Sequence, residues 1–406
     1  MKLGAVHVIR KTLLFSLCLL MLPLVTSCVG KIEIDELALV MAVGLDKGEK
    51  EGAMKVTVQV ARPADSRGQT GAPSGQTGDP IWSASAEGDT IFEAIRNLAT
   101  FSSRRVFWAH NYAIVINEDL ARETGISDII DFFTRNPQLR MRTWVVVTPD
   151  KASEVISTMT GLEVVPGEAI DKLFRYTKIS VQAPRTQMLD LQSAYLSHET
   201  QPILSRVRLQ SRGVSNKKEG QAGSYKQVEL AGAGFFKGDK LTGIIQPEEV
   251  PGLLPFIETV ETGVIAVNCP KNPSKKMSLE LRSQSFDLRP SIKNNLPAFE
   301  ATVDIFVSVV EAGCPFSLKD RQEVKDLEEE VADITRGQME FVFKKAQEEK
   351  TDFLHLGKVL NNKYPMEWKS MKDDWENILP SVKMKINITV HINESSLLYN
   401  PTKSGN

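Results

Sequence analysis

The feature that most constrains this chain is an uncharged, mainly apolar run near its start, from Thr12 to Leu24. Lys2, Arg10 and Lys11 precede the run, so a positive segment leads into an apolar one, which is the arrangement of a secretory signal. The run is about 13 residues long, short of the roughly 20 residues that a helix needs to cross a bilayer. The sequence therefore predicts that the chain is exported and folds from the residues that follow this run.

The end of the run, Val25-Thr26-Ser27-Cys28, is similar to a bacterial lipobox. In a lipobox a branched apolar residue and two small residues precede a cysteine that receives a diacylglyceryl group. Two acyl chains make a stable anchor, whereas one chain holds a protein only marginally. We therefore expect cleavage before Cys28, a diacylglyceryl lipid on Cys28, no other cofactor, and attachment to the outer face of a membrane. The alternative is that Cys28 is an ordinary residue after an ordinary signal cleavage.

The composition after the expected cleavage is that of an ordinary globular protein. The segment keeps 46 of the 49 basic residues and all 51 acidic residues, a net charge of −5. A mildly acidic, well-mixed chain argues against binding to nucleic acid, which requires a basic surface. Since about 380 residues exceed what one hydrophobic core usually serves, we expect two or three domains.

Strand and helix patterns alternate along the first half of the chain. Residues 36–48 and 53–63 read as a β-hairpin, and residues 81–88 as a further strand. Residues 88–101 predict a helix capped by Asp89 or Thr90. The segment Ser66 to Pro80 is rich in Gly, Pro, Ser and Thr, a composition typical of a mobile loop.

We expect an α+β fold of three domains, each a mainly antiparallel or mixed sheet with helices packed on it. The last domain is expected to contain three strands, a long helix capped by Ser317, and a closing strand with alternating apolar residues. The expected division is a lipoprotein signal peptide at 1–27, an N-terminal α/β domain at 28–195, a small middle domain at 196–256, a C-terminal sheet-plus-long-helix domain at 257–394, and a tail at 395–406.

Besides Cys28, two cysteines remain after the expected cleavage, Cys269 and Cys314. They follow the first and third strands of an expected up-down-up meander. Those strands would lie about 9.6 Å apart, whereas a disulfide requires Cα atoms within about 7 Å. Both cysteines lie just outside the strands, before Pro270 and Pro315, so the two loops could converge. A disulfide and a pair of free thiols both remain open.

The sequence contains no motif that indicates catalysis or metal binding. No HExxH, GxSxG, P-loop or EF-hand pattern is present. The run from Gly232 to Gly238 is one residue longer than a dinucleotide-binding loop and lies between two expected strands. The histidines after the expected cleavage have no zinc spacing; they are His110, His198, His355 and His391. We therefore predict that the protein is not an enzyme and has no catalytic, cofactor or metal site.

Two groups of side chains could bind a ligand, but simpler interpretations account for both. Five arginines could bind an anion, although solvation or pairing with the many carboxylates explains them better; they are Arg104, Arg105, Arg135, Arg140 and Arg142. Trp368 and Trp375 lie seven residues apart on an expected helix, so they share one face. Core packing explains that spacing better than a carbohydrate-binding platform does.

Several longer motifs follow one another in a set order. They are "EIDELALVMAVGLDK" just after Cys28, then "EGDTIFEAIRNL", "AHNYAIVINEDLARE", "GAGFFKGDKLTG" and "KAQEEKTDFLHLGKVLNNKYPMEW". This order, from Cys28 to about Ile392, resembles the Ger(x)C family of spore germination lipoproteins. The resemblance implies three α/β domains and a lipoprotein subunit of a nutrient germinant receptor in the spore inner membrane, needed for receptor assembly or signalling. It implies membrane-embedded A and B subunits as partners, and it carries over only Cys28 as a defined functional position.

The alternative function is a solute-binding lipoprotein that delivers a small nutrient to a membrane transporter. That function would require two similar lobes joined by a hinge, and the sequence shows no such duplication. A lipoprotein hydrolase would require catalytic residues that are missing here. Whether the chain contacts a nutrient directly remains open.

Overall fold

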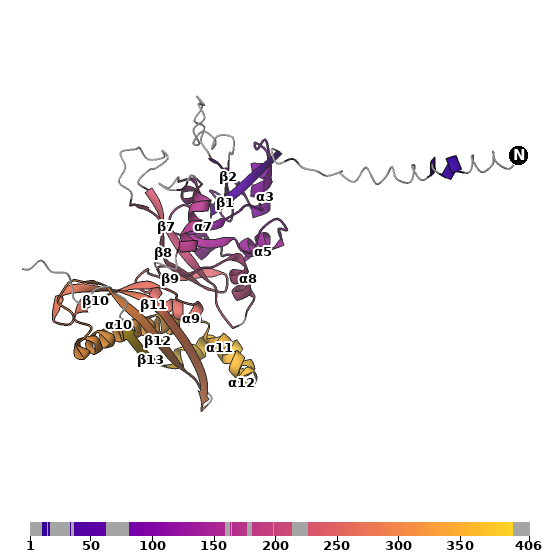
Figure 1. Cartoon of the computed structure of the whole chain (residues 1–406). Helices are drawn as coiled ribbons and strands as arrows, with labels where there is room; N and C mark the ends of the chain where they lie inside the picture. The colour runs from indigo at the N-terminus through magenta and orange to yellow at the C-terminus, as the bar shows by residue number, and fades with distance from the viewer. Residues whose placement is uncertain are drawn as a thin grey trace, which may run out of the picture.

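The computed structural model describes residues 10–13, 15–16, 33, 36–61, 81–158, 163, 165–176, 181–197, 199–212, 226–294 and 296–392. Within these ranges the chain forms two sheets with helices packed on them, as Figure 1 shows, and this confirms the predicted α+β class. Cys28, the segment Ser66 to Pro80 and the tail at 395–406 lie outside the described residues, as does most of the expected signal peptide.

The first sheet has the strand order β3-β2-β1-β5-β6-β7-β8-β9, with β4 beside β1. Its centre is parallel, because β1, β5, β6 and β7 pair in the same direction, whereas β2, β3, β8 and β9 pair antiparallel. The strands are β1 (Leu37–Lys47), β2 (Met54–Ala61), β3 (Ile81–Gly88), β4 (Arg105–Phe107), β5 (Ala113–Asn117), β6 (Trp144–Thr148), β7 (Ile203–Ser211), β8 (Lys226–Lys237) and β9 (Lys240–Ile245).

Helices cover both faces of this sheet. One face carries α3 (Ile91–Leu98), α4 (Glu118–Glu123), α5 (Ser127–Arg135) and α8 (Met188–Leu196); the other carries α6 (Ala152–Ser157) and α7 (Pro166–Tyr176). The residues of β5 alternate accordingly, since Ile114 and Ile116 lie in the first core and Ala113 and Val115 in the second. Coverage of both faces explains why β5 and β6 read as nearly continuous apolar runs.

The segment 196–256, which we expected to form a small middle domain, extends the first sheet instead. β7 pairs in parallel with β6, with Val146 opposite Ser205, and β8 and β9 continue the sheet antiparallel. The described residues therefore form two sheets where three were expected. Alternation of side chains identifies a strand but does not reveal which sheet edge it joins, and this is the physical reason for the difference. The boundaries at residues 195 and 256 stay predictions.

The second sheet has the order β10-β11-β12-β13. The first three strands form the predicted meander, and β13 lies parallel to β12 after a crossover through the long helix α10. The elements are β10 (Gly263–Cys269), β11 (Asn272–Lys293), β12 (Leu296–Ala312), α10 (Arg321–Glu348) and β13 (Lys383–Ile392). Buried residues of α10, among them Leu327, Val331 and Met339, belong to the same core as the sheet.

The cap of α10 differs from the predicted one. The carboxylate of Asp320 accepts hydrogen bonds from the backbone N–H groups of Gln322 and Glu323, at 3.0 Å and 3.3 Å. The helix therefore begins three residues later than a cap at Ser317 requires, and that prediction is wrong. Ser and Asp are both good caps, so composition alone did not separate them.

The two sheets share a continuous core. Phe235 of β8 and Ile245 of β9 belong to the same buried cluster as α9 (Val250–Ile257), α10 and the second sheet. The chain between α10 and β13 forms the remaining helices, which are α11 (Leu356–Lys363), α12 (Pro365–Met371), η5 (Lys372–Asp374), α13 (Trp375–Ile378) and η6 (Leu379–Ser381). None of the helices in the described ranges combines the length and the apolar character needed to span a bilayer.

Candidate functional site

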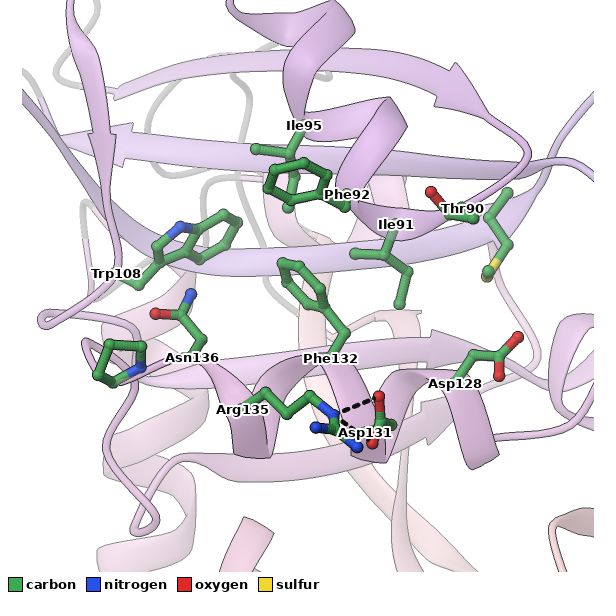
Figure 2. Close-up of a pocket in the computed structure, with 12 residues that line it drawn as sticks. Thr90, Ile91, Phe92, Ile95, Trp108, Asp128, Asp131, Phe132, Arg135 and Asn136 are labelled. Atoms are coloured by element: carbon green, nitrogen blue, oxygen red, sulfur yellow. Dashed lines mark hydrogen bonds and ion pairs between the residues drawn. The ribbon is translucent and has the colours of Figure 1, made fainter.

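An apolar groove lies between α3 and α5 on one face of the first sheet (Figure 2). Its volume is about 530 Å³. The side chain of Thr90, one of the two caps that the sequence predicted, caps α3 by accepting a hydrogen bond from the backbone N–H of Glu93, at 3.1 Å. The groove is lined by Met54, Thr90, Ile91, Phe92, Ile95, Trp108, Asp128, Asp131, Phe132, Arg135, Asn136 and Pro137.

Aromatic rings dominate the walls of this groove. Figure 2 shows Phe92 on α3, Phe132 on α5 and Trp108 around the same gap. The Phe92 side chain is 55% exposed, and the guanidinium of Arg96 lies 5.0 Å from the centre of its ring. Trp108 is buried and packs edge-on against Phe133, with ring centres 6.0 Å apart. An exposed ring over a buried aromatic floor makes a surface that can hold an apolar group.

The charged groups of the groove lie on α5. Arg135 donates from Nε to both carboxylate oxygens of Asp131, at 2.7 Å and 2.8 Å, one helical turn away. Asp128 lies in the first turn, where a negative charge is favourable to the helix dipole. Among the described residues that line this groove, no nucleophile, general base and oxyanion site come together.

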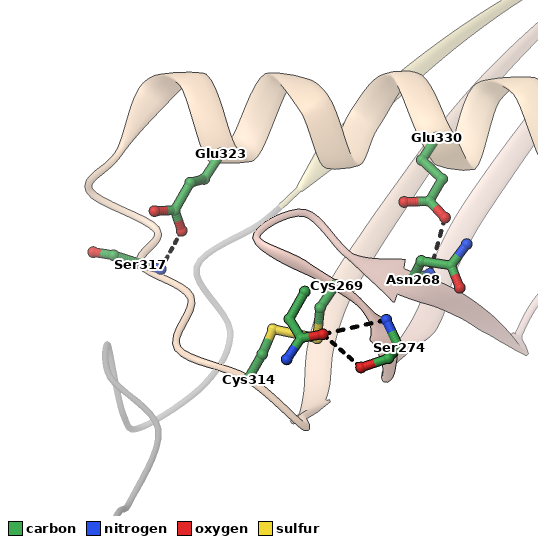
Figure 3. The surroundings of a disulfide bond; sticks show 8 residues. Asn268, Cys269, Ser274, Cys314, Ser317, Glu323 and Glu330 are labelled. Atoms are coloured by element: carbon green, nitrogen blue, oxygen red, sulfur yellow. Dashed lines mark hydrogen bonds between the residues drawn. A yellow bond between two sulfur atoms is a disulfide. The ribbon is translucent and has the colours of Figure 1, made fainter.

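A disulfide joins Cys269 and Cys314 at one end of the second sheet (Figure 3). Their Cα atoms are 6.3 Å apart and both residues are buried. Cys269 pairs with Asn272 in a tight hairpin, and farther along β11 Met277 pairs with Ala312, close in sequence to Cys314. Cys314 follows β12 as expected, whereas Cys269 is the last residue of β10 and not a loop residue. The disulfide therefore forms at the ends of the strands, and it was one of the two possibilities left open by the sequence.

The start of α10 is held against the same hairpin. The carboxylate of Glu323 accepts a hydrogen bond from the backbone N–H of Ser317, at 3.1 Å, and forms an ion pair with Lys271. Farther along α10, Glu330 accepts a hydrogen bond from the backbone N–H of Asn268, at 2.9 Å, as Figure 3 shows. Glu330 thus contacts the strand that carries Cys269, and Glu323 contacts the turn that follows it.

The loop after α10 carries a buried carboxyl group, that of Asp352. Its oxygens accept hydrogen bonds from the backbone N–H groups of Leu356 and Gly357, at 2.9 Å and 2.7 Å, and from Trp375 Nε1, at 2.9 Å. Burial raises the pKa of Asp352, and these donors oppose that rise. The group fixes the start of α11 and the ring of Trp375.

His355 lies in the same loop and is also buried. Its backbone is left-handed, with φ of 61°, and its Nε2 atom has no hydrogen-bond partner within the described part of the chain. Burial, assisted by the positive charge of Lys358, lowers the pKa of His355 to about 4. The imidazole is therefore neutral at neutral pH.

The other residues that the sequence singled out do not converge on a site. Trp368 and Trp375 are buried with ring centres 5.1 Å apart, so they belong to the core. His391 stacks on Phe306 in the second sheet, and His110 is exposed between β4 and β5 of the first sheet. His198 lies outside the described residues. Over the described ranges no group of His, Cys, Asp and Glu side chains could hold a metal ion.

Sequence reasoning missed both the groove and the Asp352 group. The signal for the groove was Phe92, an aromatic residue outside the apolar stripe of its helix. The signal for the second was Asp352 itself, an acid directly before the apolar residues Phe353 and Leu354. Neither signal identifies the whole site, because Phe132 lies far from Phe92 in the chain and the indole of Trp375 is 23 residues away from Asp352.

Comparisons with known proteins agree with the fold. A family model described as "Spore germination protein N-terminal domain" matches residues 30–209, and one described as "Spore germination B3/ GerAC like, C-terminal" matches residues 231–396. A solved structure described as "Crystal Structure of the GerBC protein" covers 86% of this chain and 96% of its own, with a TM-score of 0.52 and 19% identity, which shows a similar fold.

Curated relatives from Bacillus subtilis (strain 168) agree as well. Spore germination protein KC is 26% identical, over 97% of this chain and 98% of its own length. Spore germination protein A3 is 24% identical, over 89% of this chain and 92% of its own length. Putative spore germination protein YfkR is 29% identical over 68% of each chain. These relatives are named as spore germination proteins and not as enzymes, and together with the family models they confirm the resemblance.

Loss of the disulfide should destabilise the chain. The bond joins residues 45 positions apart, so breaking it should cost about 3–4 kcal/mol through the entropy of the unfolded state. We expect the oxidised protein to lose that much free energy of unfolding when a reductant is added, measured by urea denaturation. The matched control is Cys269→Ser with Cys314→Ser. Its free energy of unfolding should equal that of the reduced protein and should not change when reductant is added. Identical unfolding of the native chain with and without reductant would contradict the prediction.

Acid should weaken the fold through His355. Its pKa is about 4 in the folded chain and near 6.5 when exposed, so the unfolded state binds more protons between these values. The free energy of unfolding should therefore fall as the pH drops from 6.5 through 4, by about 3 kcal/mol for this group. His355→Asn keeps a residue that tolerates left-handed backbone and should flatten the pH slope relative to the native chain. Parallel slopes for the two proteins in thermal unfolding would refute this assignment.

Proposed function

Because the chain belongs to the family of GerAC-like spore germination proteins, we propose that it is a lipid-anchored subunit of a nutrient germinant receptor. The observation that carries this proposal is the match of two consecutive family models, which leaves only a short segment between residues 209 and 231 and the chain ends unmatched. The subunit is needed for assembly of the receptor or for its signalling. Its partners are the membrane-embedded A and B subunits of the same receptor.

The lipobox supports the anchoring part of this proposal. Cys28 carries the diacylglyceryl lipid and holds the chain on the outer face of the spore inner membrane. The residues between Cys28 and Leu37, the start of β1, span at most about 27 Å even when fully extended. The first sheet therefore lies close to the bilayer, with no long stalk.

Tethering explains how a subunit without a reaction centre can function by binding. Confinement beside the membrane raises the effective concentration of the partner subunits, so modest intrinsic affinity is sufficient. The apolar groove between α3 and α5 is the feature that favours the second candidate, a solute-binding lipoprotein that delivers a small nutrient to a transporter.

Removal of the lipid acceptor should release the protein. In Cys28→Ala we expect loss from the membrane fraction of spores and a weaker response to nutrients, because no acyl chain remains to hold the chain. Cys18→Ala, within the expected signal peptide, is the matched control and should retain both properties. Fractionation with immunoblotting and nutrient-triggered germination are the measurements. Normal retention in Cys28→Ala would overturn the anchor, and normal nutrient germination in spores that lack this protein and every other receptor would overturn the receptor role.

The groove should bind free nutrients weakly or not at all. Amino acids and sugars carry many polar groups, which the aromatic and aliphatic walls of the groove leave unsatisfied, and the Arg135 guanidinium of the groove is already paired with Asp131. We expect calorimetry on the chain from residue 29 onward to give no saturable heat with amino acids or sugars. Saturable binding that is lost in Ile95→Ser with Phe132→Ser, but kept in the control Phe341→Ser on α10, would favour the solute-binding function instead.

A further inference from the structure

The parallel strands of the first sheet all begin at one edge, which we call the amino edge. The register places Leu37 of β1 opposite Arg105 of β4, and Ala42 of β1 opposite Ala113 of β5, which in turn lies opposite Trp144 of β6. Parallel strands keep their starts at the same edge. Residues just before β4 and β6 therefore lie at the edge where the described chain enters β1.

Four exposed arginines gather at this amino edge, and they are Arg104, Arg105, Arg140 and Arg142. Arg104 and Arg105 lie at the start of β4, and the other two lie in the turn that leads into β6. None of the four forms an ion pair within the described ranges, whereas Arg135 and Arg206 of the same half pair with Asp131 and Glu118. The edge thus presents positive charge that the described part of the chain does not neutralise.

The described residues place two carboxylates, those of Glu36 and Asp190, near these arginines in the order of the strands. Glu36 directly precedes β1 and is exposed. Asp190 of α8 follows the segment that pairs with β6, but its carboxylate accepts a hydrogen bond from the backbone N–H of Gln187, at 3.0 Å. The sequence between Cys28 and Leu37 is itself acidic, so an anionic surface would repel that segment. Attraction to such a surface therefore has to come from the arginines.

An exposed aromatic ring accompanies the arginines. Phe101 is 55% exposed and lies in the loop that leads to Arg104, with its ring centre 6.5 Å from that of Trp82 in β3. The hydroxyl of Ser102 donates to the backbone oxygen of Arg104, at 2.7 Å, which holds the turn of this loop. Arginines and aromatic rings together are typical of protein surfaces at the membrane interface.

We propose that the amino edge docks onto anionic phospholipid headgroups of the membrane that holds Cys28. The proposal rests on the proposed lipid attachment, because the short connection to Cys28 keeps this edge within reach of the bilayer. The guanidinium groups of Arg104, Arg105, Arg140 and Arg142 face the headgroup phosphates, and Phe101 enters the interface beside them. The contact orients the first sheet, with its amino edge toward the membrane and the other ends of its parallel strands away from it.

Vesicle sedimentation of an unlipidated chain tests the docking without the anchor. The protein is the chain from residue 28 onward with Cys28→Ser, and the vesicles are phosphatidylglycerol and phosphatidylcholine in equal parts, or phosphatidylcholine alone. We expect binding to the anionic vesicles only, and we expect added salt to weaken it, because salt screens exposed charges. Replacing the four arginines by glutamine should weaken binding by about fivefold per arginine.

The matched control is Arg289→Gln with Arg321→Gln, which removes exposed arginines of the second half. The control should bind anionic vesicles as the parent chain does, and all variants should keep the parent melting temperature. Absence of anionic binding, or an equal loss in the control, would overturn the docking. A third outcome would also overturn the docking: the parent chain binds no vesicles, and the arginine variant no longer captures the A or B subunit. The edge would then contact protein and not lipid. Since no lipid is attached in this assay, failure here is separate from failure of the anchor, which Cys28→Ala reports.

Discussion

The architecture depends on the buried carboxyl group of Asp352. It accepts hydrogen bonds from the start of α11 and from the indole of Trp375, and so ties three chain segments together. On either side of this group the loop contacts the first sheet. The ring of Phe353 lies 4.5 Å from that of Phe235 in β8, and the backbone oxygen of Asp352 accepts a hydrogen bond from Gln201. Without this group the donors around it would be buried and unpaired, which is costly, and the junction between the two sheets would lose these hydrogen bonds beside its shared apolar core.

A fixed relation between the sheets separates the surfaces that matter for function. The first sheet carries the groove on one face and the arginines at its amino edge, both formed by loops and helices that a rigid parallel centre positions. The second sheet carries the disulfide, where the carboxylates of Glu323 and Glu330 hold the hairpin against α10. Each of these features thus lies on a different part of the fold.

Local patterns predicted local structure well. The hairpin of β1 and β2, the strand at 81–88 and the cap at Thr90 appear where side-chain period and capping chemistry placed them. The errors arose where two local solutions were equivalent or where the outcome was not local. The sequence pointed to Ser317 as the cap of α10, but Asp320 is the cap in the structure. Both side chains can cap a helix, so the local pattern did not separate them. The strands of 196–256 joined the first sheet because strand order depends on contacts between distant segments.

The sequence by itself determined the membership in a spore germination family, the α+β class and most of the helices and strands, because these depend on short motifs and on periods of two and 3.6 residues. The lipid on Cys28 stays a prediction from the sequence. Only the tertiary structure decided that Cys269 meets Cys314, that Arg105 lies beside Leu37 and that α3 and α5 leave an apolar groove between them. Each of these results depends on strand register and helix packing across long stretches of chain. Register and packing are set by the complementarity of distant surfaces, which a local pattern of residues does not encode.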